Sequence, residues 1–219
     1  MIAVARQHYP DQGTLLRTLS QLVADQLRAA HASKHTATLA VPGGTTPAPF
    51  LRALSEADLT WEHVRVLPTD ERQVAPDSPR SNARLIRETL LQGPAAAAML
   101  IDLGAGEAAV AAVLPIDVAV LGMGADMHTA SLFPGAPELS AALAPDAPPV
   151  MAIHPQGEPE ARITLTAQAL RHAGVIHILI TGPEKAAALD AALIDGPLSE
   201  APVRAVLGAP CPVTVHHAD

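Results

Sequence analysis

Apolar positions in the first quarter of the chain recur at helical spacing and then at strand spacing. Residues 11–31 place leucines and a valine three or four positions apart, with charged residues between them, which predicts an amphipathic helix. Residues 36–41 form a short apolar and β-branched run that is typical of a strand. Residues 47–55 predict a helix with proline at its first position, joined to the strand by a turn over residues 42–46.

The alternation of strand and helix continues along the chain. Further strands are predicted at 64–67, 97–101, 117–121, 149–153, 162–165 and 175–181, and near Val203 and Val213. Further helices are predicted at 80–91, 107–113 and 183–194, with surface loops at 93–98 and 134–149. Such alternation indicates parallel βαβ units. We therefore expect an α/β fold of Rossmann-like type, with a doubly wound, mostly parallel sheet and helices on both faces.

Length and composition favour one domain over residues 1–219. The chain of 219 residues is 49% hydrophobic, which is enough for one substantial core. Because only 2% of the residues are aromatic, aliphatic side chains must fill that core. Cys211 is the only cysteine, so a disulfide within the chain is excluded.

Charge and hydropathy argue against several classes of partner. A formal net charge of -8, with 14 Lys and Arg residues and few aromatics, disfavours nucleic-acid binding. Charges and prolines interrupt every long apolar run, and the N-terminus has no signal-peptide pattern, so we expect a cytoplasmic protein without a membrane span. A small anionic substrate in a locally cationic pocket remains compatible with the composition. A monomer or a small homo-oligomer is expected.

A glycine-rich turn follows the strand at 36–41. Gly43, Gly44, Thr45 and Thr46 lie between this strand and a helix, so their backbone N–H groups and two hydroxyls can converge on a phosphate. A tight turn in which Thr46 caps the following helix fits the same residues. The motif alone leaves both interpretations open.

Polar residues also follow the strand at 64–67. Asp70 and Arg72 come directly after it, and Asn82 lies close behind in the sequence. Carboxyl ends of parallel strands meet at one sheet edge, where α/β folds bind ligands. A solvated ion pair between Arg72 and Asp70 or Glu71 is the alternative interpretation.

A cation begins the last long predicted helix. Lys185 lies in the first turn of the helix at 183–194, where the helix dipole disfavours positive charge. A bound anion would offset that cost, and so would the neighbouring Glu184. Because the loop again follows a strand, we favour a role in binding.

The segment 122–135 carries the strongest candidate for chemistry. It follows the strand at 117–121 and places His128 on a glycine-rich turn, with Asp126 near enough to orient the imidazole. We expect a helix start there, whose N–H groups would keep the imidazole neutral, as a general base that activates water requires. Ser131 lacks the Gly-x-Ser-x-Gly context of a nucleophile. No set of metal ligands appears at suitable spacing.

Most of the ten histidines are expected to have no part in the chemistry. His177 lies inside an apolar strand and is predicted to be a core or sheet-face residue. His216 and His217 are predicted to form an exposed tail.

Four motifs in this order resemble the 6-phosphogluconolactonase family, within the wider group that includes glucosamine-6-phosphate deaminases. They are Gly43 to Pro47, Asp70 to Arg72 with Ser81 and Asn82, Gly122 to Gly135, and Thr181 to Lys185. The resemblance implies hydrolysis of a phosphosugar lactone, with His128 as the base. It also implies that Arg72, Arg162 and Lys185 are cations near the phosphate or the developing oxyanion, and that no metal or organic cofactor takes part.

Two alternative functions stay open beside the lactonase interpretation. Met127 stands where the family usually has glycine, so a backbone with positive φ would be strained there. A catalytically weakened sugar-phosphate binding protein is therefore one alternative. The other is a sugar-phosphate deaminase or isomerase. Arg72 argues against it, because the motif of deaminases reads Asp-Glu-Tyr and so has tyrosine at this position.

Overall fold

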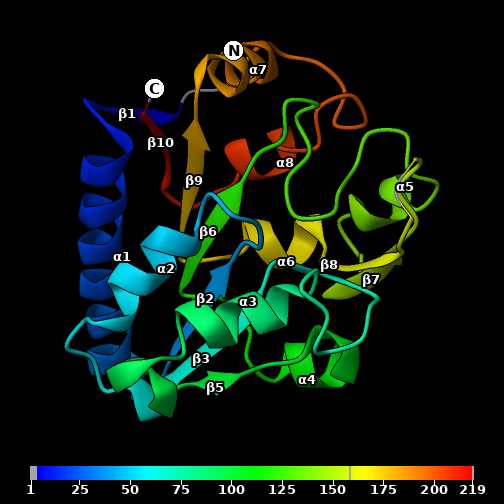
Figure 1. The fold of residues 1–219 in the computed structure, drawn as a ribbon. Helices are drawn as coiled ribbons and strands as arrows, with labels where there is room; N and C mark the ends of the chain where they lie inside the picture. Colours follow the sequence, from blue (N-terminus) through cyan, green and yellow to red (C-terminus); the bar gives the residue numbers. More distant parts are fainter. Residues whose placement is uncertain (1–3, 158, 219) are drawn as a thin grey trace.

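The structure is a computed structural model that describes residues 4–157 and 159–218, and a seven-stranded parallel sheet forms its centre (Figure 1). In spatial order the strands are β1 (Ala5–Tyr9), β10 (Val213–Ala218), β9 (Val175–Thr181), β6 (Val118–Gly122), β2 (Ala37–Val41), β3 (Val64–Pro68) and β5 (Met99–Leu100). The chain winds outward in both directions from the centre. β6 and β2 are therefore neighbours at the point where the strand order reverses, and ligands bind outside the carboxyl ends of such strands.

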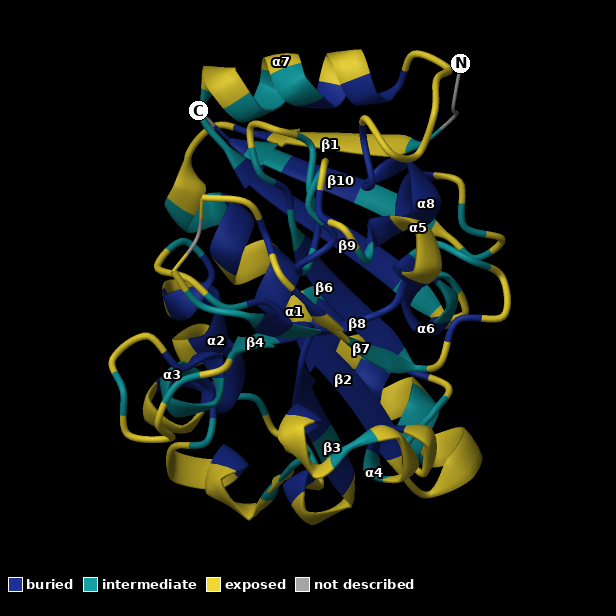
Figure 2. Ribbon diagram, turned by 90° about the vertical axis from the view of Figure 1, so that its right-hand side faces the viewer, coloured by how far each residue is buried: buried dark blue, intermediate teal, exposed yellow. Residues whose placement is uncertain are grey.

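Helices cover both faces of this sheet, as the sequence predicts. One face carries α1 (Gln12–Lys34), α2 (Ala48–Ser55) and α3 (Asn82–Thr89). The other carries α4 (Glu107–Ala111), α5 (Leu139–Ala142), α6 (Ala167–Arg171), α7 (Pro183–Ala192) and α8 (Arg204–Leu207). Short 3-10 turns lie at Trp61–His63, Gly93–Ala97 and Leu103–Ala105. The central strands are buried between these layers, whereas the outer helices present exposed surface (Figure 2).

A second, antiparallel sheet stands beside the first and was not expected from the sequence. It consists of β4 (Asp70–Arg72), β8 (Arg162–Leu165) and β7 (Val150–Ile153). The strands predicted at 149–153 and 162–165 are thus present, but they pair with each other, and β8 also pairs with the polar segment β4 that follows β3. This pairing brings Arg162 opposite Arg72, at the carboxyl end of β3.

The prediction of a strand near Val203 is wrong, because the chain forms α8 there. Arg204 is buried, and its guanidinium donates to the carbonyls of Ala191, Ala192 and Pro197, which satisfies the C-terminal end of α7. A short apolar run is compatible with strand or helix by periodicity alone. Contacts distant in the sequence decide between them here.

The exposed tail expected at His216 and His217 is also wrong, because both lie in β10 and His216 is 1% exposed. Tyr9 Oη lies 2.8 Å from His216 Nδ1, and His216 Nε2 lies 3.0 Å from His177 Nδ1. His177 Nε2 in turn lies 2.8 Å from Gln26 Oε1. The expectation of a core position for His177 is confirmed, and the two imidazoles form a buried hydrogen-bonded chain beneath α1.

Candidate active site

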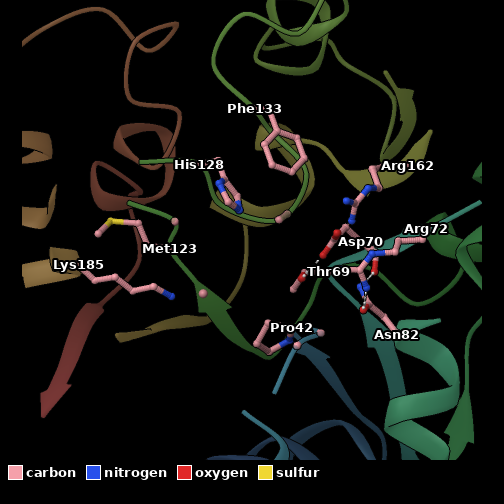
Figure 3. Close-up of a pocket in the computed structure, with 15 residues that line it drawn as sticks. Pro42, Thr69, Asp70, Arg72, Asn82, Met123, His128, Phe133, Arg162 and Lys185 are labelled. Atoms are coloured by element: carbon pink, nitrogen blue, oxygen red, sulfur yellow. Dashed lines mark hydrogen bonds between the residues drawn. The ribbon is translucent and has the colours of Figure 1, made fainter. Parts of the chain in front are cut away.

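A pocket of about 310 Å³ opens at the carboxyl ends of β2, β3 and β6, beside the point where the strand order reverses. Its walls come from six separate segments of the chain, and the close-up in Figure 3 shows their side chains. Eight of the residues expected from the sequence line it: Gly43, Gly44, Asp70, Arg72, Asn82, His128, Arg162 and Lys185. The polar loops that follow separate strands therefore do converge on one site.

His128 lies in this wall with its imidazole oriented by Asp126. The ring Nδ1 is 2.5 Å from Asp126 Oδ1, and the same carboxylate oxygen accepts from the His128 backbone N–H at 3.3 Å. The hydrogen bond from the imidazole lowers the pKa of the Asp126 carboxyl below its ordinary value, so the group is ionised at neutral pH. An ionised acceptor at Nδ1 places the ring proton there and leaves the Nε2 lone pair for another proton.

A tight turn, rather than the expected helix start, holds His128. Met127 N donates to Gly124 O at 3.0 Å, and Gly124 N donates to His128 O at 3.0 Å. Met127 closes the turn with a φ of 63°, the left-handed conformation in which a non-glycine residue is strained. Val203 N donates to Met127 O at 3.1 Å, which ties the strained residue to the segment before α8. His128 keeps its contact with Asp126 despite the strain.

Gly124 has a steric reason to be glycine. A Cβ at this position would lie 2.3 Å from the His128 imidazole and 2.4 Å from Asp126 Oδ1. A side chain here would push the histidine away from its carboxylate. The glycine, which the sequence interpretation did not single out, therefore positions the imidazole as Asp126 does.

Phe133 is a second site residue that the sequence interpretation missed. Its ring centroid is 4.4 Å from that of His128, and the Arg162 guanidinium carbon lies 5.8 Å from the same ring (Figure 3). The phenyl ring therefore packs between the imidazole and a cation. One signal was available, because the chain contains only two phenylalanines and one of them follows His128 by five positions.

Pairing of β4 with β8 places two arginines side by side. Arg72 is directly opposite Arg162 in the antiparallel register, and both line the pocket. Like charges at directly opposed positions are destabilising, so an anion between them would be favourable. On the same face Asp70 accepts hydrogen bonds from Ser131 Oγ at 2.6 Å and Thr69 Oγ1 at 3.2 Å. Ser131 is fully buried, and its hydroxyl is engaged in this bond.

Asn82 connects Arg72 to the glycine-rich turn. Its Nδ2 donates to Asp70 O at 2.7 Å, and its Oδ1 accepts from Arg72 Nη1 at 3.3 Å. A Cβ on Gly43 would lie 1.9 Å from Asn82 Oδ1, so only glycine leaves room for this amide. Gly44 has a φ of 96° and needs glycine for its backbone instead.

Lys185 lies on the opposite side of the pocket from the two arginines (Figure 3). It lies in the first turn of α7, which begins at Pro183 after Gly182, whose φ is 83°. The described residues include no ion pair with Glu184, so the alternative explanation for this charge is not supported. A second hollow of about 250 Å³ adjoins the pocket, shares Lys185 with it and is lined by Thr45 and Thr46.

The local explanations of the other motifs are also not supported. The residue at the N-cap of α2 is Pro47, with no side-chain cap, so Thr46 does not cap this helix. Arg72 donates to Arg80 O and Asn82 Oδ1, and no ion pair with Asp70 or Glu71 forms among the described residues. The motifs therefore need an explanation beyond turns and surface charge.

Residues 4–157 and 159–218 contain no group of three or more His, Cys, Asp and Glu side chains that could hold a metal ion. Across the same residues, no helix is both long enough and apolar enough to cross a membrane. The side chains that line the pocket include the His128 imidazole, the Asp70 carboxylate and three cations, Arg72, Arg162 and Lys185.

The family described as glucosamine-6-phosphate isomerases/6-phosphogluconolactonase matches residues 10–214. The chain belongs to this family. A curated relative from Mesorhizobium japonicum named 6-phosphogluconolactonase is 43% identical, over 94% of this chain and 92% of the relative. Another from Pseudomonas aeruginosa with the same name is 42% identical, over 91% of this chain and 89% of the relative.

Solved structures of the family share the fold. The crystal structure of a 6-phosphogluconolactonase from Shewanella baltica has a TM-score of 0.93 at 33% identity and covers all of both chains. A monomeric glucosamine-6-phosphate deaminase has a TM-score of 0.80 at 19% identity, over 98% of this chain and 97% of that one. The deaminase comparison concerns the fold alone, and the expected doubly wound α/β architecture is confirmed.

Proposed function

We propose that the protein hydrolyses 6-phosphogluconolactone to 6-phosphogluconate, with His128 as the general base. The observation that carries the proposal is the His128 imidazole in a pocket with three cations, its Nδ1 held 2.5 Å from Asp126. The names of the relatives at 42 and 43% identity support the same reaction. A neutral base, a positively charged site for an oxyanion and a grip on a phosphate are what lactone hydrolysis requires.

The proposed reaction begins at His128 Nε2. This nitrogen removes a proton from water as the water oxygen attacks the lactone carbonyl carbon. Asp126 stabilises the imidazolium that forms, because its carboxylate accepts the hydrogen bond from Nδ1. The tetrahedral intermediate then collapses, the bond from the carbonyl carbon to the ring oxygen breaks, and the ring oxygen takes the proton back from Nε2 as it becomes a hydroxyl. The carboxylic acid that forms loses its proton to solvent, which gives 6-phosphogluconate.

Arg72 is assigned to the oxyanion. Of its guanidinium nitrogens, only Nη1 donates to described residues, and these bonds to Arg80 O and Asn82 Oδ1 fix the group before substrate arrives. A pre-positioned cation beside the developing negative charge lowers the barrier without reorganisation during the reaction. Nε is buried and has no hydrogen-bond partner among the described residues, so the Nη2 N–H groups are the donors left for the substrate.

Lys185 and the glycine-rich turn are assigned to the phosphate. Gly43, Gly44 and Lys185 border both the pocket and the adjoining hollow, and Thr45 and Thr46 add hydroxyls there. Arg162 supplies a second cation from the other wall of the pocket. Binding the phosphate away from the carbonyl orients the lactone for attack.

The test is hydrolysis of freshly generated 6-phosphogluconolactone, followed as proton release at mildly acidic pH, for the natural protein and His128→Ala. We expect the variant to lose the acceleration by about 100-fold or more while it still binds the phosphosugar, because a base acts in the transition state. Unchanged turnover in the variant would remove His128 from the mechanism. Binding without turnover in the natural protein would support a weakened binding protein, and ammonia release from glucosamine 6-phosphate would support a deaminase.

A further inference from the structure

Glu71 lies between two pocket residues but faces away from the pocket. Side chains alternate along a strand, so β4 directs Asp70 and Arg72 to the pocket face and Glu71 to the opposite face, toward α3. Glu71 is absent from the pocket wall and makes no ion pair among the described residues. The proposed chemistry gives it no role so far.

The Glu71 carboxylate instead accepts four hydrogen bonds. Oε1 accepts from Arg72 N at 2.7 Å and Asn82 N at 2.8 Å. Oε2 accepts from Ser81 Oγ at 3.0 Å and Ala83 N at 2.7 Å. The first turn of α3 contains no acidic residue of its own. A carboxylate from β4 therefore satisfies the free N–H groups at the start of this helix, where the helix dipole favours negative charge.

The hydrogen bonds to Glu71 also hold the residues that position the Arg72 side chain. They hold Asn82 at the start of α3, and its amide reaches back to Asp70 O and accepts from Arg72 Nη1. Glu71 also binds the backbone N–H of Arg72 itself. The carboxylate thus joins both ends of the loop between β4 and α3, and the guanidinium depends on both ends for its placement.

We propose that Glu71 is a positioning residue that holds the Arg72 guanidinium in place through β4 and Asn82. The inference rests on the proposed lactonase activity, in which Arg72 faces the oxyanion. Glu71 touches no reacting atom in this scheme. Removal of the Glu71 carboxylate should therefore slow the reaction only when Arg72 is present.

The experiment is a double-mutant cycle with Glu71→Gln, Arg72→Ala and the combined variant, measured as kcat/KM for 6-phosphogluconolactone. Outer residues that orient metal ligands are worth about 10- to 100-fold in activity, and we expect a residue that orients a guanidinium to lie at the low end of that range. We expect Glu71→Gln to lower kcat/KM about tenfold when Arg72 is present and less than about twofold when it is absent. A matched control is Glu88→Gln, which also removes one carboxylate charge. Glu88 lies on α3 in an exposed ion pair with Arg84, so this variant should leave kcat/KM unchanged.

A merely structural role gives a different result. Loss of the contacts at the start of α3 lowers the free energy of unfolding in either case, so urea titrations of all variants run beside the kinetics. Equal losses of kcat/KM with and without Arg72 would overturn the proposal. If Glu71→Gln does not fold, Glu71→Asp, which keeps the charge but is one methylene shorter, takes its place in the same cycle.

The cycle also separates this inference from the proposed function. A natural protein that shows no hydrolysis refutes the lactonase activity, and the same four proteins are then compared by their Kd for 6-phosphogluconate. In that comparison Glu71→Gln should weaken binding several-fold only when Arg72 is present. Weakening that is equal in both backgrounds would refute the positioning role independently of turnover.

Discussion

The buried imidazoles of His177 and His216 should make the protein acid-labile. Burial and the neighbouring His216 charge lower the pKa of His177 to about 3, and burial lowers the pKa of His216 to about 4. Both values lie below the ordinary 6.5, so the folded protein holds both rings neutral. The unfolded chain takes up two protons as the pH falls below 6.5, and stability is therefore lost toward acid.

The size of the loss follows from this difference in proton binding. Each ring that stays neutral in the folded state costs about 1.4 kcal/mol of unfolding free energy for every pH unit below its ordinary pKa. At pH 5, about 1.5 units below that value, the two rings together give a loss of about 4 kcal/mol relative to neutral pH. Total stabilities are about 5–15 kcal/mol for most domains, so the effect is large.

Urea titrations at pH 7.5, 6 and 5 measure this loss directly. The combined variant His177→Gln and His216→Gln removes both titrating rings and keeps amide donors and acceptors beside Tyr9 and Gln26. We expect lower stability than the natural protein at pH 7.5 but a much smaller change between pH 7.5 and 5. His172→Gln, at an exposed position, is the matched control and should keep the full pH dependence. The same acid loss in the double variant would refute the reasoning.

Two further predictions concern the pocket. Lys185→Ala should raise KM for 6-phosphogluconolactone about 10- to 100-fold, the range expected for a lost charge-assisted hydrogen bond. The same variant should leave hydrolysis of unphosphorylated gluconolactone nearly unchanged. Equal losses for both lactones would contradict the assignment of Lys185 to the phosphate. Gly43→Ala places a methyl group 1.9 Å from Asn82 Oδ1 and should lower kcat/KM about tenfold or more by displacing that amide. Activity equal to that of a Gly208→Ala control would show that Asn82 does not have to stay where it is.

Local pattern was enough for much of the fold, because the periodicity of apolar residues and the turn chemistry belong to short stretches of chain. The helix predicted at 11–31 forms as Gln12–Lys34, and the strand predicted at 175–181 forms as Val175–Thr181. Parallel strands bring their carboxyl ends to one edge, so the sequence also predicted that Asp70, His128 and Lys185 would meet, and all three line the pocket.

Pairings between distant residues were beyond that pattern. Arg72 and Arg162 are 90 positions apart, and only the register of β4 with β8 makes them neighbours. Glu71 looks like half of a local ion pair in the sequence, yet its strand turns it toward the start of α3.

His216 has the polar character of a surface tail, but it is buried because β10 lies between β1 and β9. Tyr9 of β1 and His177 of β9 supply its hydrogen-bond partners, one on each side. A sequence thus determines which segments form strands and helices and which side chains they carry to an edge. The tertiary structure decides which of these side chains meet, because strand register and burial depend on segments far apart in the chain.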